Sequence, residues 1–214
     1  MPVEPRETAE NLLNQARFAI AAAEPGQWPS APGAEVAFAG RSNVGKSSAV
    51  NAITRQRGLA RTSKTPGRTQ QIVFFELGGG ARLVDLPGYG YAKVPETVRA
   101  GWARSIERYL TGRDALRGLI LVMDARHPLT ELDRRMLDWC EPGGLPVHIL
   151  LTKIDKLGRS QAGQAELSVT RAVAVLANPV TVQQFSALKR IGVSEAQEKI
   201  VSWLREPPAP IEEM

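Results

Sequence analysis

The stretch "GRSNVGKSS", residues 40–48, decides the fold of this chain and follows directly on the apolar run "EVAFA", residues 35–39. It fits the pattern Gly-x4-Gly-Lys-Ser between a predicted strand and a predicted helix, which is the context of a phosphate-binding loop. The two glycines let the backbone curl so that its N–H groups face phosphate oxygens, and the helix N-terminus favours an anion. Lys46 is placed to reach the β- and γ-phosphates, and Ser47 to ligate Mg²⁺. The stretch therefore predicts a phosphate site, with a structural turn as the alternative.

Short apolar runs alternate with helix-like segments along the rest of the chain. The predicted strands cover residues 34–40, 71–77, 81–86, 117–124, 146–153 and 179–187. The predicted helices cover residues 46–54, 95–110, 129–140, 160–177 and 192–204. This alternation predicts an α/β fold, in which a mostly parallel six-stranded sheet carries helices on both faces. The glycines at 78–80 predict a hairpin, which adds one antiparallel strand at an edge.

The two ends of the chain differ from this alternating pattern. The segment "ENLLNQARFAIAAA", residues 10–23, predicts an amphipathic helix rather than a secretory signal. Its candidate core contacts are Leu12, Leu13, Ala16, Phe18 and Ile20. The Pro-rich, acidic C-terminal tail predicts disorder. We therefore expect an N-terminal helix and lead-in over residues 1–33, one nucleotide-binding domain over residues 34–206, and a disordered tail over residues 207–214.

Composition limits the setting and the partners of the chain. Its 214 residues are 43% apolar, which fits one globular domain, and no apolar run reaches the ~20 residues of a membrane span. The single cysteine, Cys140, excludes an internal disulfide and favours a reducing, cytoplasmic setting, with the thiol as a small buried hydrophobe. The net charge of +5 permits an anionic partner such as RNA without demanding one. We expect a monomer with no membrane or DNA partner.

A second motif, "VDLPG" at residues 84–88, follows the phosphate loop after about forty residues. Asp85 ends a predicted strand, where its carboxylate can hold Mg²⁺, usually through water. Gly88 can offer its N–H to the γ-phosphate. A chance Asp-x-x-Gly is the alternative, and the motif gains weight only from its place after the first one.

Two later segments predict which base the site accepts. In "LLTKID", residues 150–155, the Lys153 stem can lie along a purine ring, and Asp155 can accept two hydrogen bonds from the N1–H and amine of guanine. Adenine lacks that donor pair and would leave a buried carboxylate unpaired. In "FSALK", residues 185–189, the N–H of Ala187 is placed near the guanine carbonyl, and Ser186 shapes the turn.

The segment "TSKTPGRTQQ", residues 62–71, lies between the first two motifs and contains no acidic residue. Thr69 is placed to ligate Mg²⁺ and to sense the γ-phosphate, as a switch threonine must. Thr62 and Thr65 are rivals on position alone, and an ordinary mobile loop is the alternative interpretation. All five elements in this order on an alternating chain predict a GTPase.

The motifs together resemble one family. The segments "GRSNVGKSS", "SKTPGRTQ", "LVDLPGYGYAKV", "DARHPLT", "LTKIDKL" and "FSALKRIG" are similar to the EngB (YihA/YsxC) family of bacterial GTPases, within the TrmE-Era-EngA-EngB-Septin-like superfamily. The resemblance covers about residues 15–205. It implies a Ras-like P-loop GTPase fold, Mg²⁺-dependent GTP and GDP binding, and a role in assembling the large ribosomal subunit. It also implies a requirement in normal cell division and septation.

The resemblance carries over to the site residue by residue. The matching nucleotide-site residues are Gly40, Arg41, Ser42, Asn43, Val44, Gly45, Lys46, Ser47, Gly67, Arg68, Thr69, Gln70, Gln71, Asp85, Leu86, Pro87, Gly88, Thr152, Lys153, Ile154, Asp155, Phe185, Ser186 and Ala187. Ser47 and Thr69 match the metal ligands, and Asp85 is the third expected one. The expected catalytic set is Asn43, Lys46, Thr69 and Gly88. Thr152, where many GTPases have Asn, is the family's own variant.

Two positions bear on how fast GTP is hydrolysed. Ras-like enzymes place a water-orienting glutamine directly after Asp-x-x-Gly, and this chain has Tyr89 there. We therefore expect slow intrinsic hydrolysis that awaits something from a partner. Asn43 suggests a bound K⁺ that acts like an arginine finger, and a loop-stabilising side chain is the alternative.

Basic residues cluster before and within the 62–71 segment, at Arg55, Arg57, Arg61, Lys64 and Arg68. Beside the γ-phosphate they could bind ribosomal RNA in the GTP state and release it after hydrolysis, and a solvated mobile switch is the alternative. A second set, at Arg99, Arg104, Arg108 and Arg113, is interrupted by Glu107 and is typical of a solvated helix face.

Three functions compete at this point. The first is a GTPase switch that times a step in ribosome assembly. The second is a constitutive RNA- or ribosome-docking module that uses GTP structurally. The third is a small-molecule kinase on the same loop, which "TKID" and the lack of an Arg-rich lid disfavour.

Overall fold

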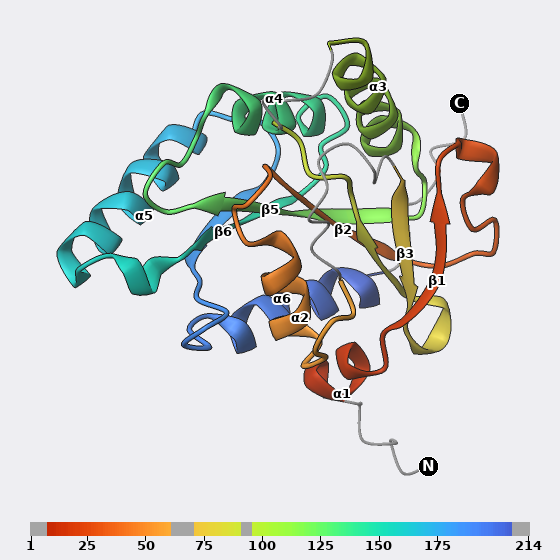
Figure 1. Ribbon diagram of the computed structural model, residues 1–214, viewed down its shortest axis with the longest axis horizontal. Helices are drawn as coiled ribbons and strands as arrows, with labels where there is room; N and C mark the ends of the chain where they lie inside the picture. Colours follow the sequence, from red (N-terminus) through yellow and green to blue (C-terminus); the bar gives the residue numbers. More distant parts are fainter. Residues whose placement is uncertain (1–7, 61–70, 91–95, 207–214) are drawn as a thin grey trace.

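The computed structural model of the chain describes residues 8–60, 71–90 and 96–206. A seven-stranded sheet with the order β1-β3-β4-β2-β5-β6-β7 forms its centre (Figure 1). The strands are β1 Arg17–Ala22, β2 Glu35–Gly40, β3 Ile72–Glu76, β4 Arg82–Asp85, β5 Leu116–Asp124, β6 Val147–Thr152 and β7 Val180–Gln184. The helices are α1 Ala9–Asn14, α2 Lys46–Ile53, α3 Glu96–Gly112, α4 Glu131–Cys140, α5 Arg159–Val173 and α6 Val193–Arg205, with short 3₁₀ turns at Pro25–Gln27, Gly78–Gly80 and Ile154–Lys156.

Helices cover both faces of the sheet, as the alternating pattern predicts. α3, α4 and α5 pack on one face, where Tyr109 and Met136 are buried. α1, α2 and α6 pack on the other face, around Leu13 and Ile53. Figure 1 shows the two groups of helices on opposite sides of the strands. β2 and β6 are buried along their whole length, which is the environment that continuous apolar runs favour in a parallel sheet.

The prediction of six strands is wrong by one, because β1 extends the sheet beyond β3. β3 runs antiparallel to both of its neighbours, β1 and β4. The antiparallel strand of the predicted hairpin therefore lies inside the sheet, and β1 forms the edge. Backbone N–H and C=O groups of β3 that would face solvent are paired by this extra strand.

The predicted helix over residues 10–23 is correct only in its first part. The helix ends at Asn14, and the chain then continues as β1. Leu12, Leu13 and Ala16 are buried as expected, whereas Phe18 and Ile20 are 62% and 37% exposed. A short isolated helix has little stability of its own, so strand pairing with β3 prevails.

The residues of the second predicted basic set do not share one environment. Arg104 and Arg108 are exposed on α3, as a solvated face requires. Arg113 instead turns toward the sheet, and its guanidinium donates from Nε to Glu35 at 2.8 Å. The solvated assignment is therefore wrong for Arg113, because a buried carboxylate at the start of β2 needs cationic partners.

The topology gathers the sequence motifs at one edge of the sheet. β2, β4, β5, β6 and β7 are parallel, so the loops after their carboxyl ends lie side by side. Ligands of open α/β sheets bind at this edge. No helix within residues 8–60, 71–90 and 96–206 is long and apolar enough to cross a bilayer.

Candidate nucleotide-binding site

The phosphate loop, residues 40–47, connects β2 to α2 in a conformation that needs its glycines. Gly45 precedes α2 with a φ of 104°, in the region that side chains disfavour. A Cβ on Gly40 would lie 2.8 Å from the carbonyl oxygen of Val122. The Ser42 N–H donates to the Tyr89 carbonyl at 2.8 Å, which ties the loop to the second motif. The loop is therefore held at both ends, as a rigid phosphate cradle must be.

The structure brings the loop lysine and the second-motif carboxylate together. Lys46 and Asp85 form an ion pair, and both side chains are nearly buried. Ser47 follows in the first turn of α2. A hydroxyl and a carboxylate are the hard oxygen donors that Mg²⁺ prefers, so these two residues fit the expected metal. The described residues contain no group of three or more His, Cys, Asp or Glu side chains placed to hold a metal.

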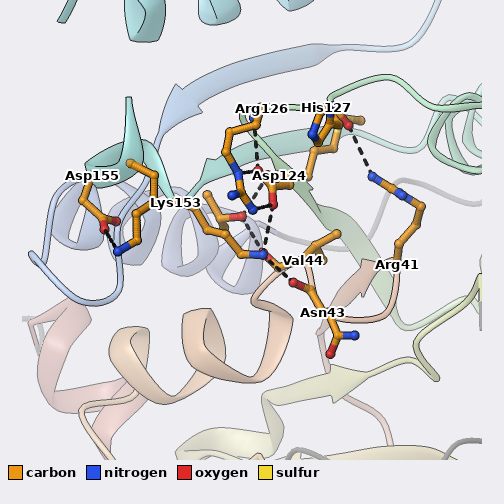
Figure 2. A network of polar contacts seen from close by, with 11 residues as sticks. Arg41, Asn43, Val44, Asp124, Arg126, His127, Lys153 and Asp155 are labelled. Carbon is orange, nitrogen blue, oxygen red and sulfur yellow. Dashed lines mark hydrogen bonds and ion pairs between the residues drawn. The ribbon is translucent and has the colours of Figure 1, made fainter. Parts of the chain in front are cut away.

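The base-recognition segment, residues 152–155, is bonded to the phosphate loop. The Thr152 hydroxyl lies 2.5 Å from the Val44 carbonyl oxygen and 2.9 Å from that of Met123. The Lys153 ammonium donates to the Asn43 carbonyl at 2.6 Å, as Figure 2 shows. The segment predicted to recognise the base and the predicted phosphate loop are therefore parts of one connected structure.

Asp155 is oriented by a neighbour from the loop after β7. The Ser186 hydroxyl donates to one carboxylate oxygen of Asp155 at 2.6 Å. The Lys189 N–H donates to the same hydroxyl oxygen at 3.1 Å, which fixes Ser186 in turn. Phe185 is buried, and its N–H donates to the Leu151 carbonyl at 2.9 Å. Ser186 thus aims the carboxylate as well as shaping the turn, a role that the sequence interpretation missed.

The Tyr89 side chain lies in the core beneath α4. Its side chain is buried and belongs to the apolar cluster on that face of the sheet. Its hydroxyl donates to Asp133 at 3.3 Å, and Arg41 lies 3.6 Å from the other oxygen of that carboxylate. Burial first, and then the Asp133 charge, raise the pKa of Tyr89 well above its usual value. The phenol is therefore neutral, and its hydroxyl is engaged by Asp133.

Comparison with known proteins agrees with this geometry. Residues 35–153 match the model of a family described as "50S ribosome-binding GTPase". A relative from Aromatoleum aromaticum, "Probable GTP-binding protein EngB", is 55% identical over 193 residues, which cover 90% of this chain and 89% of that protein. A protein of the same name from Thiobacillus denitrificans is 55% identical over 197 residues, 92% of this chain and 95% of that protein. The chain belongs to the EngB family of GTP-binding proteins. It is a GTPase, and GTP and GDP are its ligands.

Solved structures share the fold. The crystal structure of a probable GTP-binding protein engB superposes with a TM-score of 0.67 at 21% identity and covers 81% of this chain and 100% of that one. The structure of Era with MgGDPNP and nucleotides 1506–1542 of 16S ribosomal RNA has a TM-score of 0.63 at 21% identity and covers 86% of this chain and 61% of that one. The likeness to these structures shows the P-loop GTPase fold.

Not every expected site residue of this EngB chain lies in the described part. Gly67, Arg68, Thr69 and Gln70 lie outside the described residues, as do the rival candidates Thr62 and Thr65. Gln71 is exposed just before β3. Leu86 and Pro87 are buried, Gly88 is half-buried beside the phosphate loop, and Ile154 and Ala187 line the base-recognition loops.

The structure adds residues that the sequence interpretation missed. Asp124 ends β5 at the nucleotide edge and contacts both Arg126 and Lys153 (Figure 2). Asp133 joins Tyr89 to Arg41, a link that the sequence interpretation missed, whereas its capping of α4, where the Thr130 N–H donates to it at 3.0 Å, confirms the capping box that the sequence predicts. A polar residue at the end of a buried apolar strand was the available signal for Asp124. The capping role of Asp133 follows from its spacing after Thr130.

Proposed function

We propose that this chain is a Mg²⁺-dependent GTPase that acts as a switch in assembly of the large ribosomal subunit in the cytoplasm, and that normal cell division and septation depend on it. The match of residues 35–153 to a family described as "50S ribosome-binding GTPase" carries the proposal. Era, which has this fold, was solved with part of 16S ribosomal RNA from the small subunit, so it supports RNA of the ribosome as a partner class and not the choice of the large subunit. The link to division rests on the family resemblance. We expect the chain to act as a monomer.

In this proposal, each part of the nucleotide would have its own partner in the site. The loop N–H groups and Lys46 would hold the phosphates, and Lys46 would exchange its contact with Asp85 for a phosphate oxygen. Asp85 and Ser47 would then hold Mg²⁺ together with Thr69. The metal would supply positive charge against the β- and γ-phosphate oxygens. Asp155, aimed by Ser186, would read guanine.

Slow intrinsic hydrolysis follows from the orientation of Tyr89. A neutral phenol bonded to Asp133 has no group to offer a water near the γ-phosphate. Unassisted Ras-like hydrolysis runs several thousandfold below ~1 per second. We expect a similarly low single-turnover rate without a partner. A rate above ~1 per second in pure protein would contradict this part of the proposal.

We also propose that a K⁺ ion bound at Asn43 speeds hydrolysis, because Tyr89 cannot orient the attacking water. The Asn43 side chain is exposed beside the phosphate loop, while its backbone carbonyl is occupied by Lys153. An amide oxygen is a suitable ligand for a monovalent cation, and the cation would stabilise charge that develops on the phosphates. Equal hydrolysis rates in K⁺ and Na⁺ would remove the idea. Asn43→Ala should abolish any K⁺ stimulation.

The decisive experiment measures binding of the chain to purified large subunits with GDP and with a non-hydrolysable GTP analogue. A switch should bind subunits more tightly with the analogue, and linkage requires the subunits to raise analogue affinity by the same factor. Asp155→Asn should lose guanine binding, because its amide presents a donor where guanine needs an acceptor. That variant should also lose the nucleotide effect on subunit binding.

The orientation of Tyr89 also keeps a second function open. A poor hydrolase could be a constitutive docking module in which GTP serves the fold. Subunit affinity that is the same with GDP, with the analogue and in Asp155→Asn would establish this alternative.

In cells, depletion of the protein should lower the number of mature large subunits and, at the same time, make the cells grow as filaments. Restoration of both by Asp155→Asn would contradict the switch.

A further inference from the structure

The segment "DARHPLT", residues 124–130, contributes to the family resemblance but has no role in the site described so far. Its first residue, Asp124, is the last residue of β5 and is only 6% exposed. In the parallel pairing of β5 with β6, Asp124 lies opposite Thr152. This register places the Asp124 carboxylate next to the residue after Thr152, which is Lys153.

The carboxylate contacts two cations of different exposure. The Lys153 ammonium lies 2.9 Å from Oδ2 of Asp124 and also donates to the Asn43 carbonyl at 2.6 Å. Arg126 donates from Nε to Oδ1 at 2.9 Å, and its side chain is 43% exposed. Figure 2 shows the ammonium between the carboxylate and the phosphate loop. Lys153 therefore bridges the end of β5 and the phosphate loop.

Both backbone positions joined by this bridge are strained. Asn43 has a φ of 62° and Lys153 a φ of 59°, in the left-handed region that residues with side chains rarely adopt. Such conformations persist only where the surroundings hold them. Fixing the long lysine stem also costs rotamer entropy. A carboxylate that fixes the ammonium before nucleotide arrives removes these costs from the binding step.

We propose that Asp124 is a positioning residue of the guanine-nucleotide site, which fixes the Lys153 ammonium against the Asn43 carbonyl and so joins the base-recognition segment to the phosphate loop. The inference rests on the proposed nucleotide site, in which Lys153 lies along the purine. Charge alone predicts the opposite effect of losing Asp124. Removing a carboxylate near the phosphates raises the positive potential and should tighten binding of an anion. The direction of the change therefore separates positioning from simple electrostatics.

The test is a double-mutant cycle with GDP as the ligand, using Asp124→Asn, Lys153→Met and the double variant. Asp124→Asn should raise the Kd about tenfold or more, the size expected for losing a charged hydrogen bond. In the Lys153→Met background the same change should have no further effect, because Asp124 acts through that ammonium. Tighter binding, or equal weakening in both backgrounds, would overturn the proposal. If Lys153→Met itself leaves the Kd unchanged, the proposed nucleotide site falls too.

Further variants separate positioning from a general loss of structure. Arg126→Gln should stay within about twofold of the parent Kd, because Lys153 keeps its partner Asp124 when the two Arg126 hydrogen bonds to that carboxylate are lost. A loss as large as that of Asp124→Asn would assign the role to Arg126 instead. Asp124→Glu keeps the charge and should recover part of the affinity. The preference for GDP over inosine diphosphate, measured as the ratio of their affinities, should not change in Asp124→Asn. Asp155→Asn should lose this preference.

Discussion

The two ends of β2 each carry a cluster of charged side chains, and the clusters are built differently. At the amino end, Glu35 is completely buried and accepts hydrogen bonds from Tyr109 at 2.8 Å and from Arg82 at 3.3 Å, beside Arg113. At the carboxyl end, Lys46 and Asp85 are nearly buried, and Lys153, whose side chain is 32% exposed, keeps part of its surface accessible. One cluster is enclosed by protein, and the other opens toward the predicted ligand.

The surroundings of the two clusters extend this difference. The amino-end arginines also donate to the carbonyls of Pro29 at 2.7 Å and Ala31 at 3.2 Å, so the cluster fastens the lead-in segment to the sheet. Trp28 of that segment packs edge-on to Tyr109, with ring centroids 5.3 Å apart. The carboxyl-end cluster instead lies beside strained backbone at Asn43 and Lys153. A fully buried carboxylate with many protein partners serves the fold, whereas charged pairs beside strained backbone indicate a binding site.

The largest expected effect is at the enclosed end. Glu35→Ala should lower the free energy of unfolding by about 3–5 kcal/mol, because it leaves the buried Arg82 guanidinium and the partly buried Arg113 guanidinium without their anion. Urea unfolding at pH 7 measures the change. Glu107→Ala, on the exposed face of α3, is the matched control and should stay within ~0.5 kcal/mol. A loss below ~1 kcal/mol for Glu35→Ala would show that the amino-end cluster is not structural.

A smaller loss of stability but a clear loss of affinity is expected at the open end. Thr152→Val removes the hydroxyl that bonds the Val44 carbonyl at 2.5 Å. We expect about 1–2 kcal/mol lower stability and a roughly tenfold higher Kd for GDP. Thr181→Val, which removes a sheet hydroxyl bonded to His148, should leave the Kd unchanged. If folded Glu35→Ala raised the Kd for GDP as much as Thr152→Val does, the two ends of β2 would not differ in function.

The sequence predicts the phosphate loop and the Lys46 and Asp85 side chains of the open end because their signals are local. Loop glycines, a following lysine and a carboxylate at a strand end are encoded within a few residues, so their spacing predicts their placement. The same holds for the cap of α4, where Thr130 and Asp133 are three residues apart. Strand and helix order follow from hydrophobic runs in the same way.

The enclosed end and the links between motifs depend on distant pairings that spacing cannot reveal. Arg113 meets Glu35 from 78 positions away, so its sequence neighbours suggested only a solvated helix. Tyr89 and Asp133 are 44 positions apart. β1 was mistaken for helix because its short Ala-rich stretch has no strong period, and only the free edge of β3 decides its conformation.

A smaller effect is expected when the stability of the open end is followed toward acid pH. Burial opposes the charge of Asp124, but hydrogen bonds from Arg126 and Lys153 hold the pKa of its carboxyl well below the usual range. A depressed folded-state pKa means that the carboxylate stabilises the fold above its unfolded pKa of about 3.9 and loses that contribution as pH falls further. The difference in unfolding free energy between the parent and Asp124→Asn should therefore be constant from pH 5 to 8 and shrink below about pH 4. A difference that grows toward acid pH would contradict this assignment.

The smallest effect is expected at Tyr89, which lies near the open end but belongs to the core. Its hydroxyl is 3.3 Å from Asp133, a long hydrogen bond, and Asp133 retains Arg41 and the α4 cap when the hydroxyl is lost. Tyr89→Phe should therefore cost about 1 kcal/mol or less in stability. The single-turnover rate of GTP hydrolysis should stay the same, because the phenol faces α4 rather than the phosphates. A tenfold slower rate in Tyr89→Phe would mean that the phenol reaches the attacking water, and Tyr89 would then belong to the open cluster rather than to the core.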